Sequence, residues 1–437
     1  MELDLAAIHG GRAQIVDEPR LHAMLLLGGW VHSLDDPDRA RLAANEAQAV
    51  IDALVAAGLP HVAGGEHRRF DAYQATNAVR WAGRHARSGA LRDVWHERFV
   101  ATGRRTAATL ARHARPQRFS IVLRRTIAVH ADHGDPVRIR VPIPLEDGGQ
   151  SAIAVEAVTQ NLVEPLRHGD GWAEARVRPQ SGAGGHPPLS PRSGTAELAI
   201  RVGVTVAPVQ PVIEPERIRL ADVDPEKAEL YGRRRDGLIV VTPAIASLAA
   251  ELAGSIHDPW SVLKRFWRFL FTRLQIGPLY HATLPAADPL AALIDGGWAD
   301  CYAATALLVA LCRASGIPAR MVGGYFLYPC SPTNHYWAEV LLPPFGWVPF
   351  DLSCWEFAAG DPDDPVWADY FFGWVDPRLV TERLPRQFTS RRGLAVPRDV
   401  VLLQAAVAGG GVDLSVYGVT PPAFVYSDRV EVDFSRR

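Results

Sequence analysis

Residues 297–302 read Gly-Trp-Ala-Asp-Cys-Tyr, and an apolar run of alanine, leucine and valine residues follows. Asp300 is typical of a helix N-cap, and a Gly-Ile-Pro stretch closes the run. The pattern predicts a helix over 301–314 that begins at Cys301. Backbone N–H groups without intrahelical acceptors and the positive end of the helix dipole lie at such a position, which lowers the pKa of a thiol. This setting favours a nucleophile that attacks a carbonyl carbon.

A lone cysteine can also be a core residue, half of a disulfide or a metal ligand. The chain contains Cys301, Cys312, Cys330 and Cys354. Cys301 and Cys312 are expected on one helix about 16 Å apart, which is too far for a disulfide. The histidine and cysteine spacings match no common zinc pattern, and His130 with His133 is better explained as a solvated turn. We therefore expect no metal and no cofactor.

Three stretches after the helix alternate as half-buried strands do, at 319–328, 334–342 and 346–353. His335 lies at the start of the second stretch, and Asp351 lies near the end of the third. Taken alone, the histidine could be a sheet residue and the aspartate a turn residue. Together with the thiol they can form a Cys-His-Asp triad, in which the histidine pairs with the thiolate and the aspartate orients the imidazole.

Four linked motifs occur in this region, in order: Gly296-Gly-Trp-Ala-Asp-Cys, Arg313-Ala-Ser-Gly-Ile-Pro-Ala-Arg-Met-Val-Gly-Gly-Tyr, His335-Tyr-Trp-Ala-Glu-Val and Gly346-Trp-Val-Pro-Phe-Asp. They resemble the transglutaminase-like (transglutaminase/protease) superfamily over about 275–352. The resemblance implies a papain-like α+β core in which Cys301 is the nucleophile, His335 the histidine and Asp351 the aspartate of the triad. One position departs from the family, because Ala299 stands where a glycine is usual. This alanine predicts a narrower approach to the thiol.

The chain divides into three parts by the period of its apolar residues. Residues 1–116 predict a helical domain of unknown role, and residues 117–225 predict an all-β sandwich-like domain with a proline-rich linker. Residues 226–437 are assigned to the catalytic domain. A β-domain before the core and the stretch 370–380 are both similar to bacterial members of the superfamily. The expected fold class is α+β, with a papain-like transglutaminase core preceded by an all-β sandwich-like domain and an N-terminal helical domain.

Composition narrows the range of partners. The 46 basic and 48 acidic residues give a net charge of −2, which provides no electrostatic footprint for nucleic acid or an anionic membrane. No apolar run is long enough to span a bilayer, and the N-terminus has no signal-peptide pattern. We expect a cytoplasmic protein that acts on a peptide, protein or acyl substrate, with an amine as a further possible acceptor.

These observations predict a cysteine-dependent acyl-transfer enzyme that acts on an amide or related acyl carbonyl through a thioester on Cys301. If water resolves the thioester, the protein is a peptidase or amidase, which we favour slightly. If an amine resolves it, the protein is an amide-forming acyltransferase of transglutaminase type. A third hypothesis is a non-catalytic scaffold that presents residues 1–116 to a partner, although a scaffold has no need of all three triad residues.

Overall fold

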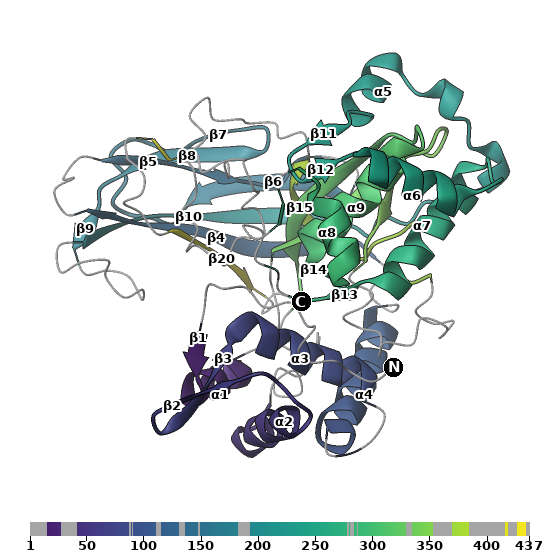
Figure 1. Ribbon diagram of the computed structural model, residues 1–437. Coiled ribbons are helices and arrows are strands. Elements are labelled where there is room, and N and C mark those ends of the chain that lie inside the picture. The colour runs from purple at the N-terminus through teal and green to yellow at the C-terminus, as the bar shows by residue number, and fades with distance from the viewer. Residues whose placement is uncertain are drawn as a thin grey trace.

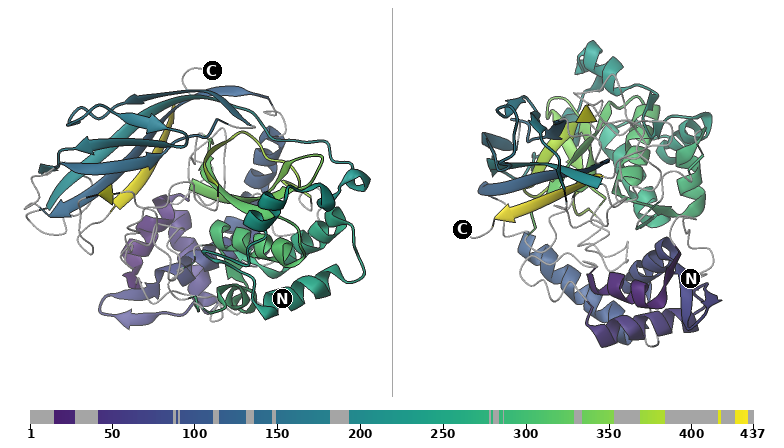
Figure 2. Two further views of the ribbon diagram at one scale, coloured as in Figure 1. Left: turned by 90° about the horizontal axis from the view of Figure 1, so that it is seen from above. Right: turned by 90° about the vertical axis from the view of Figure 1, so that its left-hand side faces the viewer.

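The computed structural model of the chain describes residues 15–27, 42–86, 89, 91–110, 115–130, 136–146, 149–181, 193–277, 279, 284–285, 287–328, 334–352, 369–383, 416–417 and 426–433. Within these ranges the chain forms a helical N-terminal domain, a β-sandwich and a mixed domain of helices and sheet, which we call the catalytic domain after the prediction above (Figure 1). The sandwich and the catalytic domain lie side by side, and the N-terminal domain lies beneath both (Figures 1 and 2).

The N-terminal domain combines helices with a small sheet. Its helices are α1 (Glu18–Leu27), α2 (Ala44–Ala56), α3 (Ala72–His85), the π-helical turn η2 (Arg92–His96) and α4 (Glu97–Leu110). Its strands are β1 (Ile15–Asp17), β2 (Val62–Gly64) and β3 (His67–Asp71). They form an antiparallel sheet in the order β1-β3-β2. The sequence predicted the helices but not this sheet, because strands of three to five residues are too short to show a clear alternation.

The β-sandwich consists of two sheets that share one core. The first contains β20 (Tyr426–Asp433), β4 (Gln117–His130), β10 (Ser193–Val206) and β6 (Gln150–Ala157), with β9 (Gln180–Ser181) also paired to β10. The second contains β19 (Val416–Tyr417), β5 (Val137–Pro142), β8 (Trp172–Val177) and β7 (Arg167–Gly169). Alternate residues such as Ile121 in β4 and Ile139 in β5 point into the common core, as the two-residue period of strands requires.

The end of the chain differs from the expected domain boundary. Strand β20 pairs antiparallel with β4 along its whole length, and β19 pairs with β5. Residues 416–417 and 426–433 were assigned to the catalytic domain, but they complete the two sheets of the sandwich. A short strand far from its partner along the chain has no local signal that names the sheet it joins.

The proline-rich segment 207–225 packs onto the catalytic domain. It contains the 3-10 turns η3 (Pro215–Arg217) and η4 (Leu220–Asp222), and Ile218 between them is buried in the catalytic core. Helix α5 (Pro225–Tyr231) and the hairpin of β11 (Arg235–Asp236) and β12 (Ile239–Val240) follow.

The catalytic domain places helices against one antiparallel sheet. Its helices are α6 (Pro243–Ala253), α7 (Pro259–Arg273), α8 (Pro289–Gly296) and α9 (Cys301–Ala314). The sheet has the order β17 (Trp347–Phe350), β16 (Asn334–Leu341), β15 (Ala319–Phe326) and β18 (Arg378–Arg383). A separate parallel pair, β13 (Gln275–Ile276) and β14 (Trp298–Ala299), leads into α9.

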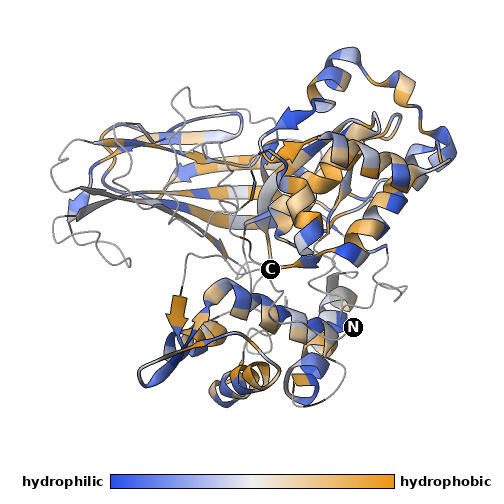
Figure 3. Cartoon of the chain, in the orientation of Figure 1, coloured by the Kyte–Doolittle hydropathy of each residue, from blue (hydrophilic) through white to orange (hydrophobic). Residues whose placement is uncertain are grey.

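Helix α9 is the central element of this domain. Every residue from 302 to 313 is buried. In Figure 3 the helices of this domain carry both orange hydrophobic stretches and blue hydrophilic stretches. A helix that is apolar on all sides is stable only when other elements surround it. The burial fixes α9, and with it the position of Cys301 at its N-terminal end.

Both neighbouring domains hold the catalytic domain at defined points. Leu327 and Leu379 are buried in the core of the sandwich, so the edge strand β18 is covered by that domain. On the other side, Trp298 of β14 is buried in the core of the N-terminal domain, and Arg84 Nη1 of α3 donates a 2.8 Å hydrogen bond to the carbonyl of Ile276 in β13.

The expected α+β fold class is confirmed, with further β-sheets beside the sheet that carries His335. Among the residues that the structure describes, no helix is both long and apolar enough to cross a membrane.

Candidate active site

Cys301 is the first residue of α9. The carboxylate of Asp300 caps the helix by accepting a 2.8 Å hydrogen bond from the N–H of Ala303, and the carbonyl of Asp300 accepts from the N–H of Ala304 at 2.9 Å. Cys301 is partly exposed, whereas the next twelve residues are buried. The fold therefore presents this sulfur at the positive end of a buried helix, as the sequence predicts.

Ala299, which replaces the usual glycine of the family, is completely buried in the core of the catalytic domain. Its carbonyl accepts a 3.0 Å hydrogen bond from the N–H of Gly277. The additional methyl group packs inside the domain, and its effect on the approach to Cys301 stays a prediction.

The second cysteine of the helix, Cys312, differs from Cys301 in its exposure to solvent. Cys312 has no exposed surface, and burial raises the pKa of its thiol strongly. A buried thiol of this kind is chemically inert. Cys330, Cys354, the side chain of His130 and the whole of His133 lie outside the described residues. Within the described part of the chain, no three His, Cys, Asp or Glu side chains group as a metal site.

The structure brings His335 and Asp351 together. The Nε2 atom of His335 lies 2.9 Å from Oδ1 and 3.0 Å from Oδ2 of Asp351. A carboxylate can only accept, so the ring donates from Nε2, which leaves Nδ1 as the nitrogen available to a second partner. His335 is 4% exposed and Asp351 is 1% exposed, so water competes little with this contact.

Helix α9 packs against the strand that carries His335. The rings of Tyr302 and Tyr336 meet edge to face with centroids 4.8 Å apart, and the hydroxyl of Thr305 donates a 3.2 Å hydrogen bond to the carbonyl of Tyr336. These contacts join the residue after Cys301 to the residue after His335. The direct pairing of the thiol with the imidazole stays a prediction.

Aromatic side chains hold the imidazole in its plane. The ring of His335 stacks on Phe326 with a centroid distance of 4.2 Å and an interplanar angle of 20°. Trp337 lies nearly parallel on the same strand, with its ring centroid 6.1 Å from the imidazole. Phe326 stacks in turn on Tyr328 at 4.8 Å. Such stacking restricts rotation of the imidazole about its side-chain bonds.

Sequence reasoning missed a buried arginine behind the aspartate. Arg378, the first residue of β18, forms an ion pair with Asp351 through Nη1, and its Nε donates a 2.8 Å hydrogen bond to Oδ1 of Asp376. All three side chains are at most 3% exposed. The only available signal was the pair Asp376-Pro-Arg378 within the stretch that resembles bacterial members, and that resemblance gives neither residue a role.

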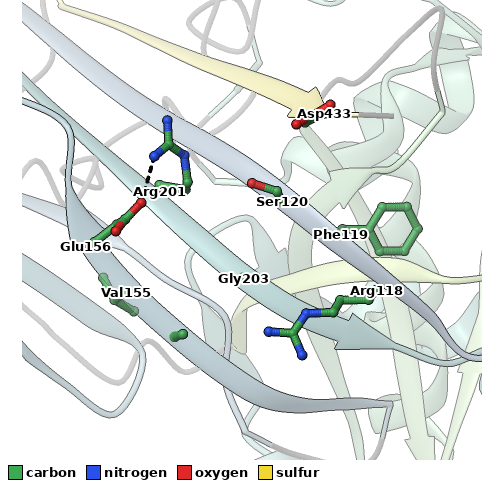
Figure 4. Close-up of a pocket in the computed structure, with 9 residues that line it drawn as sticks. Arg118, Phe119, Ser120, Val155, Glu156, Arg201, Gly203 and Asp433 are labelled. Atoms are coloured by element: carbon green, nitrogen blue, oxygen red, sulfur yellow. Dashed lines mark hydrogen bonds and ion pairs between the residues drawn. The ribbon is translucent and has the colours of Figure 1, made fainter. Parts of the chain in front are cut away.

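Two cavities elsewhere do not include the triad. A shallow groove of about 420 Å³ on the solvent face of the sandwich is lined by Arg118, Arg201 and Glu156 among others, with Arg201 paired to Glu156 (Figure 4). A smaller cavity of about 80 Å³ lies between the sandwich and the catalytic sheet, where Gln150 and Arg378 contribute to its wall.

The range that matches a known family includes this site. Residues 246–352 match the family described as the transglutaminase-like superfamily. No curated protein matches the chain in sequence. Among solved structures, the chain is similar to a candidate cysteine protease from Cytophaga hutchinsonii, with 14% identity, a TM-score of 0.42, and coverage of 73% of this chain and 91% of that chain.

It is also similar to the periplasmic domain of TgpA from Pseudomonas aeruginosa, with 16% identity, a TM-score of 0.30, and coverage of 60% of this chain and 95% of that chain. Cys301, His335 and Asp351 all lie within the matched range, and the match supports a cysteine-dependent enzyme. Residues 246–352 of this chain therefore form a domain of the transglutaminase-like superfamily.

Proposed function

We propose that the protein is a cysteine-dependent acyl-transfer enzyme that acts on an amide or related acyl carbonyl, with Cys301 as nucleophile. The observation that carries the proposal is the buried hydrogen bond between His335 and Asp351. His335 lies on a strand that packs against the helix that begins at Cys301. A partly exposed sulfur at a helix N-terminus and an oriented imidazole are the two parts that nucleophilic catalysis needs.

The reaction proceeds in two steps. The thiol of Cys301 gives its proton to His335, and the thiolate attacks the carbonyl carbon to form a tetrahedral oxyanion beside the N–H groups at the start of α9. The carbon–nitrogen bond then breaks, and the leaving amine takes the proton from His335. A thioester remains on Cys301. Asp351 stabilises the imidazolium during both proton transfers, and it keeps a proton on Nε2 of His335.

The acceptor in the second step separates a peptidase or amidase from an amide-forming acyltransferase. Water attacks the thioester, gives a proton to His335 and releases a carboxylic acid, or an amine does the same and releases an amide. We favour hydrolysis, because water needs no binding site of its own. An amine has to be held beside the thioester while water is kept away.

A non-catalytic scaffold is the competing proposal from another class. The argument against it is energetic. A buried ion pair often makes a protein no more stable than packed apolar residues would. A scaffold would not need Asp351 to be buried against His335. Peptide, protein or acyl substrates and a cytoplasmic location remain part of the proposal.

Intact-mass spectrometry tests the proposal. The full chain is mixed with peptide thioesters, peptide amides and other acyl donors, and the mass of the acyl adduct is followed with and without a fluorescent primary amine. We expect an adduct on Cys301 that decays mainly to the free acid. Cys301→Ala should form none, and the matched variant Cys312→Ala should behave as the wild type.

The other results have definite meanings. An amide product that dominates in the presence of the amine would support the acyltransferase. No adduct with any donor, together with alkylation of Cys301 no faster than that of a simple thiol, would support the scaffold.

A further inference from the structure

We propose that Arg378 and Asp376 form a positioning pair for the catalytic aspartate, which keeps Asp351 ionised and aimed at His335. This inference rests on the proposed function of the Cys301 site. The guanidinium bridges two carboxylates, because its Nη1 pairs with Asp351 and its Nε donates to Asp376 at 2.8 Å. The pair therefore acts on the reaction through Asp351, without contact to the substrate.

The surroundings of Arg378 fix the plane of its guanidinium. Its central carbon lies over three aromatic rings, 4.5 Å from the centroid of Phe371, 4.9 Å from that of Phe326 and 5.5 Å from that of Trp337. Aromatic faces attract a cation and also exclude water from it. A planar fork held in this way can present two N–H groups to two carboxylates in fixed directions, which an ammonium group cannot do.

The backbone beside Asp351 supports the same interpretation. Phe371 has φ 59°, a left-handed conformation that a bulky residue rarely adopts. Its carbonyl accepts a 3.1 Å hydrogen bond from the N–H of Asp351, and its ring covers Arg378. Strain of this kind persists where the surroundings require one geometry, and it concentrates at functional sites. Phe371 therefore contacts both residues, Asp351 through its carbonyl and Arg378 through its ring.

Charge balance explains why two carboxylates face one arginine. Asp351, Asp376 and Arg378 carry a net charge of −1 when all are ionised. The imidazolium of His335 cancels that charge at the moment when the thiolate forms. Two buried carboxylates without a cation would repel each other, and one would take up a proton. Arg378 contacts both, and its direct ion pair with Asp351 favours the ionised form of that carboxylate, which stabilises the imidazolium.

The titratable groups that face Asp351 and its partners come from three segments of the chain. They are His335 of β16, Arg378 of β18, Asp376 before it and Tyr328 after β15. Burial lowers the pKa of Arg378 to about 10, so the guanidinium keeps its charge at neutral pH. Burial raises the pKa of Asp376 to about 7, and its contact with the Tyr328 hydroxyl acts against that rise.

The test measures the rate at which iodoacetamide alkylates Cys301 in the full chain, between about pH 4 and pH 9, with the labelled peptide identified by mass. In Arg378→Met the two carboxylates lose their common cation and hold one proton between them up to a higher pH. While that proton is on Asp351, the imidazolium and the thiolate are both less populated. The acidic limb of the rate profile should therefore move upward by about one to three pH units.

Two further variants distinguish a loss of the positioning of Asp351 from a general loss of structure. Arg378→Met combined with Asp376→Asn removes the competition for the proton, so the acidic limb should return to its wild-type position. Arg378→Lys keeps the charge but not the fork, so its limb should stay near that of the wild type while the rate falls. If Arg378→Met does not fold, these two variants carry the test.

Arg320→Met is the matched control. Arg320 is buried in the same sheet, where it pairs with Glu339 at 2.6 and 2.8 Å and lies over the rings of Trp347 and Tyr231. This variant should lower the melting temperature without moving the acidic limb. A limb that moves equally in Arg320→Met and Arg378→Met would mean that general loosening of the sheet is the cause, and would overturn the inference.

The inference and the proposed function fail in different ways. If wild-type Cys301 reacts as an ordinary thiol, the proposed function is wrong. If wild-type Cys301 is activated but folded Arg378→Met has the same profile, the enzyme stands and the positioning pair is wrong. A limb that moves in Arg378→Met but is not restored by Asp376→Asn would exclude Asp376 as the second partner.

Discussion

Asp351 interacts with two cationic or cation-forming groups at once, the ring of His335 and the guanidinium of Arg378. A carboxylate held on both sides cannot rotate freely, so it selects the tautomer of the imidazole that carries its proton on Nε2. In the proposed mechanism, the proton that moves during the reaction is carried by the other nitrogen, Nδ1. The histidine then transfers protons, and the aspartate orients and stabilises the imidazole.

The two residues should therefore respond differently to substitution. We expect His335→Ala to reduce kcat/KM to background, because the thiol then has no proton acceptor and the leaving group no acid. Asp351→Asn should retain measurable activity, about 10²- to 10⁴-fold below the wild type, because the imidazole is misoriented but present. Steady-state kinetics on any substrate that loads Cys301 would measure both.

Asp236→Asn serves as the control for the aspartate, because Asp236 pairs with the buried Arg313 at the opposite end of α9 with an N–O distance of 3.4 Å. It should leave kcat/KM within about twofold of the wild type. Equal losses in Asp351→Asn and His335→Ala would show that the aspartate takes part in proton transfer itself, contrary to this assignment of roles.

The three residues of the candidate triad could be singled out from sequence because each lies in a local pattern. Cys301 follows a helix cap, His335 is the second residue of an alternating strand, and Asp351 directly follows another. Arg378 and Asp376 could not be predicted in the same way. Their role depends on the meeting of β18 with the segment after β17, and a contact between distant segments leaves no periodic trace in either one.

At the scale of elements, the N-terminal domain docks onto the strand pair that leads into the nucleophile. Trp298 of β14 lies in the core of that domain, and Arg84 of α3 bonds to the backbone of β13. Gly277 follows β13 directly, and a Cβ there would meet Asn77 Oδ1 far inside contact distance and Trp298 at 3.1 Å. An alanine at this position would therefore have to displace the side chain of Asn77 on α3, or of Trp298.

We expect Gly277→Ala to lower the free energy of unfolding by about 1–3 kcal/mol, because either α3 or the strand pair has to move. Since the strand pair precedes Cys301, the rate of Cys301 alkylation should fall as well. Thermal denaturation and peptide-resolved labelling would measure both effects.

Gly203→Ala is the matched control, because Gly203 lies in the open sandwich groove and an added Cβ would meet nothing nearer than 3.8 Å (Figure 4). Asn77→Ala added to Gly277→Ala should recover part of the lost stability by removing the clashing oxygen. If Gly277→Ala is as stable and as reactive as Gly203→Ala, the docking contact has no influence on the site.

Periodicity was a good guide to the long elements and a poor guide to the short ones. Helix α9 and strands β4 and β10 extend over fourteen residues each, enough for the apolar pattern to repeat several times. Periodicity does not indicate which other strand an element pairs with. Nothing in the sequence of β20 indicates that it pairs with β4, because register between distant strands is set by the assembled cores.

At the scale of the whole molecule, strand β18 joins the sandwich to the active site. Three successive residues of β18 make different contacts. Arg378 pairs with Asp351, Leu379 is buried in the sandwich core, and the backbone of Val380 is hydrogen-bonded to the sandwich. Gln150 of β6 makes that last contact twice, by accepting from the N–H of Val380 at 2.8 Å and donating to its carbonyl at 2.9 Å. The sandwich therefore supports the strand that carries Arg378.

The last prediction is that a substitution in the sandwich changes the chemistry of the site. Gln150→Ala removes both hydrogen bonds to Val380, and we expect the free energy of unfolding to fall by about 1–3 kcal/mol. Arg378 is two residues away on the same strand, so the alkylation rate of Cys301 should fall severalfold. The control is Asn161→Ala, which removes an exposed sandwich hydrogen bond to the carbonyl of Arg178 without touching β18. A Gln150→Ala protein that is less stable but alkylates Cys301 at the wild-type rate would limit the sandwich to a passive anchor, whereas a slower rate in that variant alone would make β18 the path by which the sandwich sets the geometry of the triad.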